Sequence, residues 1–254
     1  MALLELNNVS LRFGGLTALS AFDFALDPGQ LVGLIGPNGA GKTTAMNVVT
    51  GVYRPSAGAI RMDGKPIAGR KPFAINRIGI ARTFQNVRLF GGLSVLDNVL
   101  VGFNQSIAHG FLGTILRSPK HTRDDAAHDR AALELLETFD LADRHETLAR
   151  NLPYGDQRRL EIARALATRP KILLLDEPAA GMNPREKIEL MKLIRLVRDR
   201  FGVGIWLIEH DMKLVMSICE RITVLDHGET IARGTAAEVQ CDPKVIEAYL
   251  GEPV

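Results

Sequence analysis

Apolar residues along the first quarter of the chain either alternate with polar residues or run together. Residues 4–6 and 22–26 show the period-two alternation of half-buried strands, whereas residues 31–35 form an unbroken apolar run typical of a strand buried on both faces. A further short strand is expected at residues 58–62, before an Asp-Gly turn. We therefore expect residues 3–35 to be mainly β-strand.

The middle of the chain, from about residue 92 to residue 168, changes to helical spacing. Apolar residues recur every three or four positions in residues 124–139, which predicts an amphipathic helix. Residues 102–122 are rich in Gly, Ser, His and Pro. They are expected to form a loop-containing insertion with a short helix at residues 111–116.

In the last third of the chain, strand and helix patterns alternate. Buried strands are predicted at residues 172–175, 203–208 and 221–225. Amphipathic helices are predicted between them, at residues 184–201 and 212–219. Alternating strands and helices favour a parallel sheet. The predicted fold class is therefore α/β, with a mainly parallel sheet core interrupted by a helical insertion.

Composition excludes several classes of protein. The chain has 254 residues, 46% hydrophobic and 24% charged, which allows one large domain or a domain with an inserted subdomain. A net charge of +2 gives no indication of a nucleic-acid partner. The two cysteines form neither a disulfide framework nor a metal motif. Neither a secretion signal nor a run of about 20 apolar residues is present, so we expect a cytoplasmic protein whose membrane association comes through a partner.

The sequence Gly-Pro-Asn-Gly-Ala-Gly-Lys-Thr at residues 36–43 directly follows the apolar run at residues 31–35, and residues 42–49 have a helical pattern. Glycines in such a turn let backbone N–H groups face an anion at the positive end of the helix. Lys42 is expected to reach the β- and γ-phosphates, and the Thr43 hydroxyl to bind Mg²⁺. The expected nucleotide-binding residues of this segment are Gly36, Pro37, Asn38, Gly39, Ala40, Gly41, Lys42, Thr43 and Thr44. The chain is thus predicted to bind a nucleoside triphosphate.

Two acidic residues, Asp176 and Glu177, follow the apolar run at residues 172–175. Because ligand sites of parallel sheets lie at the carboxyl ends of the strands, both carboxylates should face the phosphate-binding loop. Asp176 is expected to hold Mg²⁺ through water. Glu177 is expected to orient or deprotonate the attacking water.

Two further polar residues are candidates for contact with the phosphates or the metal ion. His210 comes after the strand at residues 203–208 and could donate a hydrogen bond to the γ-phosphate. Gln85 lies where the α/β core gives way to the helical region. Its amide could contact Mg²⁺ or a water of the ion, and so report the γ-phosphate to the insertion. Lys42, Gln85, Glu177 and His210 are therefore the predicted catalytic set.

The segment at residues 152–166, Leu-Pro-Tyr-Gly-Asp-Gln-Arg-Arg-Leu-Glu-Ile-Ala-Arg-Ala-Leu, completes these motifs. With it, nearly the whole chain resembles the nucleotide-binding subunit of an ABC transporter. The resemblance implies a P-loop NTPase cassette in which residues 1–88 and 160–254 form the core with an antiparallel β subdomain. Residues 89–159 then form the inserted helical subdomain.

In this family two cassettes close head to tail, and each ATP lies between the phosphate-binding loop of one subunit and the signature segment of the other. The resemblance therefore implies that Pro153, Tyr154 and Gly155 face the nucleotide of a partner cassette. It also implies that Phe13, upstream of the phosphate-binding loop, stacks on adenine. ATP and Mg²⁺ are the implied cofactors.

A narrower resemblance connects the chain with the ATPase subunits of branched-chain amino-acid importers. It rests on residues 82–90, the irregular insertion, residues 154–161, residues 178–184 and the ending at residues 248–252. It implies a second ABC ATPase, two membrane permease subunits and, indirectly, a periplasmic or extracellular solute-binding protein as partners. The implied location is the cytoplasmic face of the inner membrane.

The signature departs from the common Leu-Ser-Gly-Gly-Gln. Pro153 has neither the hydroxyl nor the N–H of the usual serine, and Tyr154 replaces a glycine. This half-site is expected to be weakened, which favours a heterodimer with a second ATPase. The turn residue Asn183 also replaces the usual aspartate.

Two alternatives remain open from the sequence. One is the ATPase of lipopolysaccharide or drug export, which shares every catalytic motif. The other is a soluble ABC ATPase that acts on ribosomes or DNA. Such proteins usually carry two cassettes, long coiled coils or zinc modules, and this chain has one cassette and none of these additions.

Overall fold

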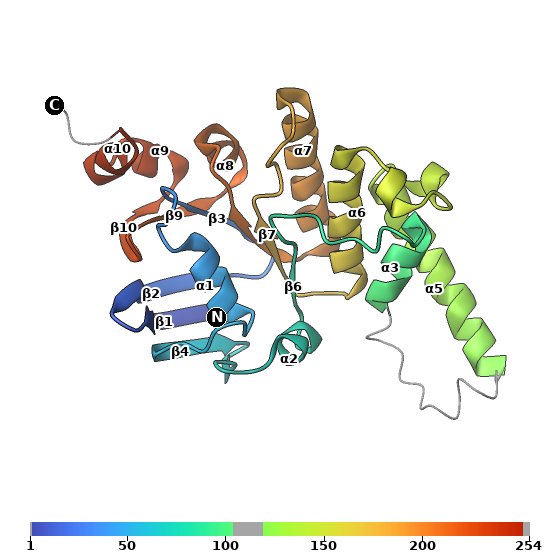
Figure 1. Cartoon of the computed structure of the whole chain (residues 1–254), viewed down its shortest axis with the longest axis horizontal. Coiled ribbons are helices and arrows are strands. Elements are labelled where there is room, and N and C mark those ends of the chain that lie inside the picture. The colour runs from blue at the N-terminus through green and yellow to red at the C-terminus, as the bar shows by residue number, and fades with distance from the viewer. Residues whose placement is uncertain (1, 104–118, 251–254) are drawn as a thin grey trace. The chain divides into compact units, whose positions relative to one another are not determined.

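A computed structural model of the chain describes residues 2–103 and 119–250. The chain divides into two compact units (Figure 1). Residues 1–85 and 171–254 form the first unit, and residues 86–170 form the second. The segment expected to be a helical subdomain, residues 89–159, lies inside the second unit, which continues to residue 170.

The first unit contains a four-stranded antiparallel sheet in the order β2-β1-β4-β5. Its strands are β1 (Leu4–Phe13), β2 (Leu16–Leu26), β4 (Ala57–Met62) and β5 (Lys65–Pro66). β1 and β2 form a hairpin through the turn at Gly14 and Gly15. The structure confirms the strands predicted before residue 35 and at residues 58–62.

The same unit contains a six-stranded sheet in the order β10-β9-β3-β8-β7-β6, parallel except for β10. Its strands are β3 (Leu31–Ile35), β6 (Ile80–Arg82), β7 (Ile172–Asp176), β8 (Gly204–Ile208), β9 (Arg221–Asp226) and β10 (Glu229–Gly234). Every residue of β3, β7 and β8 is buried. This burial explains their unbroken apolar sequences, because a parallel strand is covered on both faces. The parallel sheet is confirmed, whereas the sequence pattern does not predict β6 or β10.

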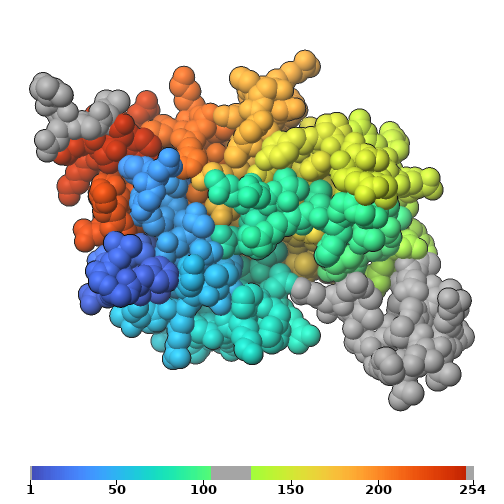
Figure 2. Space-filling view, in the orientation of Figure 1, coloured from blue at the N-terminus to red at the C-terminus, as the bar shows by residue number. Residues whose placement is uncertain are grey.

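Aromatic packing joins the two sheets. The ring of Trp206 from β8 stacks on Phe24 of β2, with ring centroids 4.1 Å apart, and lies 6.4 Å from the ring of Phe22. Such pairs contribute about 0.5–1.5 kcal/mol each beyond the burial of apolar area. Figure 2 shows the N-terminal strands (blue) beside the C-terminal segments (orange to red). The amide of Ser20 in β2 donates to the carbonyl of Gly228, which lies just before β10, at 2.8 Å.

The helices of the first unit are α1 (Lys42–Val49), α2 (Pro72–Arg77), α7 (Pro184–Phe201), α8 (Met212–Ile218), α9 (Ala236–Gln240) and α10 (Pro243–Leu250). α7 has the predicted bounds because both ends are specified locally. The Asn183 side chain accepts from the amide of Glu186 at 3.0 Å, and the Glu186 carboxylate accepts from the amide of Asn183 at 2.9 Å. Gly202 ends the helix in the left-handed conformation.

In its described residues, the second unit contains α3 (Val95–Phe103), α5 (Pro119–Thr138), α6 (Tyr154–Ala167) and the 3₁₀ turns η2 (Ala142–Arg144) and η3 (Ala149–Asn151). α5 confirms the predicted helix and begins five residues earlier than expected. α3 packs closely on α6 at Gly102, where a Cβ would lie 2.5 Å from the carbonyl oxygen of Arg164. The short helix expected at residues 111–116 lies outside the described residues. No helix in the described part of the chain has the length and apolarity of a bilayer-spanning segment.

Candidate active site

The predicted loop at residues 36–43 connects β3 to α1. Gly36 and Gly41 have φ angles of 153° and 100°. A Cβ at Gly36 would lie 2.0 Å from the carbonyl oxygen of Leu225, and one at Gly41 would lie 2.7 Å from that of Ala18. Both positions therefore require glycine, for conformation and for space. The backbone of this loop is held against β9 and β2.

Lys42 lies beneath the loop and is buried. Its ammonium donates to the carbonyl oxygens of Gly36 at 2.7 Å and Pro37 at 2.8 Å. Burial lowers the pKa of Lys42, and the negative charges of Glu177 and Asp176 raise it. The loop lysine and both predicted carboxylates thus share one electrostatic environment.

The outer part of the loop is open to solvent. Asn38, Gly39 and Thr43 are exposed, and Pro37 and Thr44 are half-buried. Ala40 is buried, and its carbonyl accepts from the amide of Gly228 at 3.0 Å. The Thr43 hydroxyl is consequently accessible at the first turn of α1.

Three neighbouring strands bring the remaining residues to the same edge of the sheet. β8 pairs with β3 on one side and with β7 on the other. The phosphate-binding loop follows β3, Glu177 follows β7, and His210 follows β8. Since all three strands are parallel, their carboxyl ends meet at one edge, as the sequence predicts.

Glu177 is the centre of this group. Its Oε1 lies 2.5 Å from Nε2 of His210, and its Oε2 accepts from Nε2 of Gln85 at 2.8 Å. Its amide donates to the carbonyl of Ile208 at 2.9 Å. Glu177 has a φ of 48°, a conformation that costs energy for a residue with a side chain and is concentrated at functional sites. The structure therefore brings Gln85, Glu177 and His210 into direct contact.

Asp176, the last residue of β7, is buried and pairs with an arginine that the sequence analysis did not select. Nη2 of Arg82 lies 2.7 Å from Oδ2 of Asp176, and Nη1 of Arg82 donates to Oδ1 of Asn47 on α1 at 2.7 Å. The only sequence signal was a basic residue three positions before Gln85. This signal indicates a partner for Asp176 only when β6 is known to pair with β7.

Glu209 is a second residue that the sequence analysis did not select. It is 4% exposed, and its Oε1 accepts from the amide of Ala179 at 2.7 Å. Its Oε2 accepts from the amide of His210 at 3.3 Å. Burial raises the pKa of Glu209 to about 7 against these two hydrogen bonds, which lower it. Its position directly before His210 at a strand end was the available signal.

Phe13 ends β1 with its ring exposed. The ring of Tyr53, also exposed, packs edge-on against it, with centroids 5.1 Å apart and an interplanar angle of 79°. The predicted adenine-stacking residue is thus one of a pair of aromatic rings. Tyr53 carries no recognisable motif in the sequence.

Pro153, Tyr154 and Gly155 lie at the start of α6 in the second unit, with Pro153 as the N-cap. The Tyr154 hydroxyl accepts from Nε of Arg158 at 3.1 Å. Nη1 of Arg158 in turn pairs with Oε2 of Glu161 at 3.1 Å, and both of these side chains are buried. A buried ion pair therefore fixes the tyrosine that replaces the usual glycine.

Within the described residues, no three His, Cys, Asp or Glu side chains cluster as metal ligands. A Mg²⁺ ion does not require such a cluster, because it keeps several waters and binds one or two protein groups together with phosphate oxygens. The accessible Thr43 hydroxyl and the Asp176 carboxylate are oxygen donors of this kind. The residues present are compatible with a magnesium ion bound together with a nucleotide.

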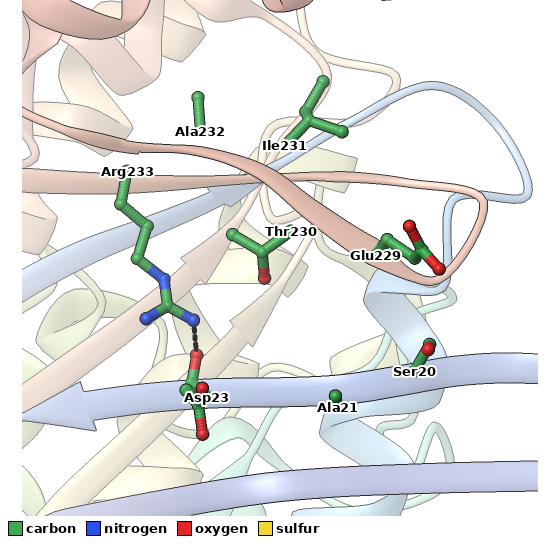
Figure 3. A pocket seen from close by; sticks show the side chains of 8 residues that line it. All are labelled: Ser20, Ala21, Asp23, Glu229, Thr230, Ile231, Ala232 and Arg233. Atoms are coloured by element: carbon green, nitrogen blue, oxygen red, sulfur yellow. Dashed lines mark hydrogen bonds between the residues drawn. The ribbon is translucent and has the colours of Figure 1, made fainter.

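A cavity of about 570 Å³ lies elsewhere in the first unit, between β2 and β10 (Figure 3). Its lining residues are Ser20, Ala21, Asp23, Glu229, Thr230, Ile231, Ala232 and Arg233. The guanidinium of Arg233 donates to the backbone carbonyl of Asp23 across it. None of the predicted site residues lines this cavity, so it is separate from the group around Glu177.

Comparison with known proteins identifies the family of similar chains. Residues 19–180 match the family model described as "ABC transporter", and residues 229–254 match one described as "Branched-chain amino acid ATP-binding cassette transporter". The chain is 45% identical over 250 residues to the high-affinity branched-chain amino acid transport ATP-binding protein BraF of Pseudomonas aeruginosa. It is 47% identical over 251 residues to LivG of Escherichia coli, a protein of the same description. Each alignment covers 98% of both chains.

Among solved structures, the chain is similar to an ATP-binding cassette of an ABC transporter crystallised in its ADP conformation. The TM-score is 0.85 at 29% sequence identity, covering 99% of this chain and 100% of the other.

Proposed function

The chain belongs to the ABC transporter family of ATP-binding proteins, and from this membership we propose that it hydrolyses MgATP to drive the import of branched-chain amino acids. Membership makes it the ATP-binding, ATP-hydrolysing subunit of a transporter. It also confirms the resemblance and the α/β cassette fold that the sequence predicts. The solute, the magnesium ion, the residue roles and the partners are the proposed part.

The observation that carries the proposed ATP hydrolysis is the contact of Glu177 with both Gln85 and His210 beside the loop of Lys42. Phosphoryl transfer requires charge stabilisation and positioning more than covalent chemistry. We assign Lys42 to the β- and γ-phosphates and Glu177 to the attacking water. His210 then donates to the γ-phosphate, where charge develops in the transition state.

Thr43 and Asp176 are the residues that would hold Mg²⁺. The side-chain amide of Gln85 would be a further ligand or would contact a water bound to the ion. When bound, the ion neutralises charge on the phosphate oxygens. The guanidinium of Arg82, with Nη2 2.7 Å from Oδ2 of Asp176, holds that carboxylate in its orientation. Phe13, together with Tyr53, offers an exposed aromatic surface on which adenine could stack. Pro153, Tyr154 and Gly155 are assigned to the nucleotide of a partner cassette.

The segment after Gln85 is the proposed dock for a membrane subunit. The amide of Arg88 donates to Oε1 of Glu161 at 3.2 Å, and the backbone of Phe90 exchanges hydrogen bonds of 3.0 and 3.1 Å with the Asn98 side chain. The segment is thus fixed to α6 and α3, yet Phe90 is 50% and Leu93 38% exposed. Exposed apolar side chains on a fixed backbone suit a protein interface. Because this segment follows Gln85 directly, a displacement of Gln85 would be transmitted to it.

The branched-chain assignment rests on the two similar transport proteins and on the match of residues 229–254. The proposed assembly contains a second ABC ATPase, two membrane permease subunits and an external solute-binding protein. The chain then lies at the cytoplasmic face of the membrane and is held there by its partners.

Affinity purification of the tagged chain from its own membranes tests this assembly. We expect two membrane subunits and a second ATPase to co-purify, and deletion of the chain to abolish uptake of labelled leucine. Re-expression of the parent chain should restore uptake, whereas Lys42→Ala at the same expression level should not. Co-purified ribosomes or DNA would contradict the proposal, as would normal leucine uptake combined with defective lipopolysaccharide export.

A further inference from the structure

Two separate polar contacts join the segment after β7 to the segment after β8. The first connects side chains, with Oε1 of Glu177 2.5 Å from Nε2 of His210. The second connects a side chain to the backbone, since Oε1 of Glu209 accepts from the amide of Ala179 at 2.7 Å. Ala179 lies two residues after Glu177, and Glu209 lies one residue before His210. The two contacts therefore link the same pair of segments.

The second contact is the more deeply buried one. Glu209 is 4% exposed, whereas the side chain of His210 is 45% exposed. A carboxylate in this environment loses much of its hydration, which is costly unless hydrogen bonds replace the lost water. The amides of Ala179 and His210 supply two such bonds. The nearby charges are Glu177, which opposes a negative charge on Glu209, and Lys187, which favours it.

The turn that bears Glu177 depends on this support. Glu177 has a φ of 48°, and after it the chain turns through hydrogen bonds from Ala180 to Glu177 at 3.1 Å and from Met182 to Ala179 at 3.2 Å. Without the contact to Glu209, the Ala179 amide would lose its buried acceptor and the turn could rotate. A displacement of about 1 Å at a reacting group can lower a rate about 100-fold.

We propose that Glu209 is a positioning residue that holds the turn bearing Glu177 at a fixed separation from His210, through its hydrogen bond with the Ala179 amide. It rests on the proposed roles of Glu177 and His210 in ATP hydrolysis. Glu209 itself contacts neither nucleotide nor water in this role. For this role the side chain must be long enough to accept from the Ala179 amide, and its negative charge is not required.

A matched pair of substitutions at Glu209 separates the effect of side-chain length from the effect of negative charge. Glu209→Gln keeps the length and an acceptor oxygen but removes the charge, whereas Glu209→Asp keeps the charge but shortens the side chain. The test is steady-state ATP hydrolysis by the full chain in its purified complex, with kcat and KM for MgATP measured separately. We expect Glu209→Asp to lower kcat at least tenfold with KM within twofold, and Glu209→Gln to keep at least a third of the parental kcat. Glu146→Gln, at an exposed site, controls for the loss of a carboxylate.

The reverse order, with Glu209→Asp active and Glu209→Gln inactive, would overturn the inference. A parental kcat in Glu209→Asp, or a KM that rises in proportion to the loss of kcat, would also overturn it. If the parent complex hydrolyses ATP and Glu177→Gln does not, the proposed role of Glu177 in hydrolysis stands whatever Glu209→Asp shows. If Glu177→Gln hydrolyses ATP at the parental rate, the proposed role of Glu177 itself fails.

Hydrogen exchange gives a readout that does not require Glu209→Asp to fold. The Ala179 amide of the parent chain should exchange at least tenfold more slowly than the solvent-exposed amides of the same chain. In Glu209→Gln it should stay protected. Rapid exchange of the Ala179 amide in the parent chain would contradict the proposed hydrogen bond.

Discussion

Arg82 and Asp176 form an ion pair at the ends of the neighbouring strands β6 and β7, with Nη2 2.7 Å from Oδ2 and side-chain exposures of 7% and 4%. The same guanidinium donates to Asn47, so it also connects α1 to the sheet. Asp176 is the carboxylate assigned to magnesium. Its orientation therefore depends on a residue that lies 94 positions earlier in the sequence.

Replacing Arg82 with Leu should destabilise the chain by about 3–5 kcal/mol, because it leaves the buried Asp176 carboxylate without its partner. Urea denaturation followed by circular dichroism measures this change. Arg77→Leu, at an exposed position on α2, is the control and should cost less than about 1 kcal/mol. Equal stability of the two variants would show that the ion pair contributes nothing.

Replacing Glu177 with Gln should lower ATP turnover by about 10²–10⁴-fold, since the amide cannot accept a proton from the attacking water. Nucleotide binding should persist, because the phosphate-binding loop is unchanged. Hydrolysis and equilibrium binding of a labelled ATP, measured on the same preparation, separate the two effects. Hydrolysis at the parental rate would remove Glu177 from the chemistry.

Replacing Lys42 with Ala should have the opposite effect to Glu177→Gln: the primary defect should be weaker nucleotide binding rather than slower hydrolysis of bound ATP. The substitution removes the buried ammonium and its two hydrogen bonds to the loop carbonyls. It also removes the assigned contact with the phosphates. A charge-assisted hydrogen bond from this ammonium to a phosphate contributes about 1.5–3 kcal/mol to binding, so its loss corresponds to an affinity about 10- to 150-fold lower. Fluorescent-nucleotide titration measures it, and unchanged affinity would argue against the assigned contact with the phosphates.

The stability of the chain should depend on Glu209 between pH 4.5 and about 7. The pKa of this residue is raised from 4.5 to about 7 by burial, so in this range the folded chain holds a proton that the unfolded chain has released. Its contribution to the free energy of unfolding is present in full below pH 4.5, falls as the pH rises and is lost above about 7. The total loss is about 3 kcal/mol.

Glu209→Gln has no such proton and should lack this part of the pH dependence. Urea denaturation of both proteins at about pH 5 and about pH 8 isolates the difference, because the other titrating groups are common to the two chains. The same change of stability with pH in both proteins would show that Glu209 titrates normally.

The signature residues predict unequal ATP sites in a heterodimer. Pro153 cannot donate the hydroxyl hydrogen bond of the usual serine, a loss of about 1.5–3 kcal/mol at a charged phosphate. A partner ATPase with an intact signature would complete the site that contains Lys42 and Glu177 of this chain. In the reconstituted transporter, Glu177→Gln should therefore reduce transport much more than the equivalent substitution in the partner. Equal losses from the two substitutions would exclude this asymmetry.

Several features of the fold and of the site follow from local sequence. The glycines and Lys42 of the phosphate-binding loop act within one strand–turn–helix unit, and α7 carries its start signal at Asn183 and its stop signal at Gly202. The strands β6 and β10 lack such signals, because β6 has only three residues and no residue of β10 is fully buried, so neither shows the apolar pattern of a strand.

Sequence alone therefore determined that Lys42 follows the phosphate-binding loop and that Asp176, Glu177 and His210 stand at or just after strand ends, which is a property of each segment by itself. Only the tertiary structure decided that Arg82 pairs with Asp176 and that Glu209 holds the Ala179 amide. Both relationships depend on the strand order β8-β7-β6, which brings together segments far apart in the sequence. The physical reason is burial: a charged side chain shielded from water must find its partner among spatial neighbours, and the linear sequence does not specify which neighbours those are.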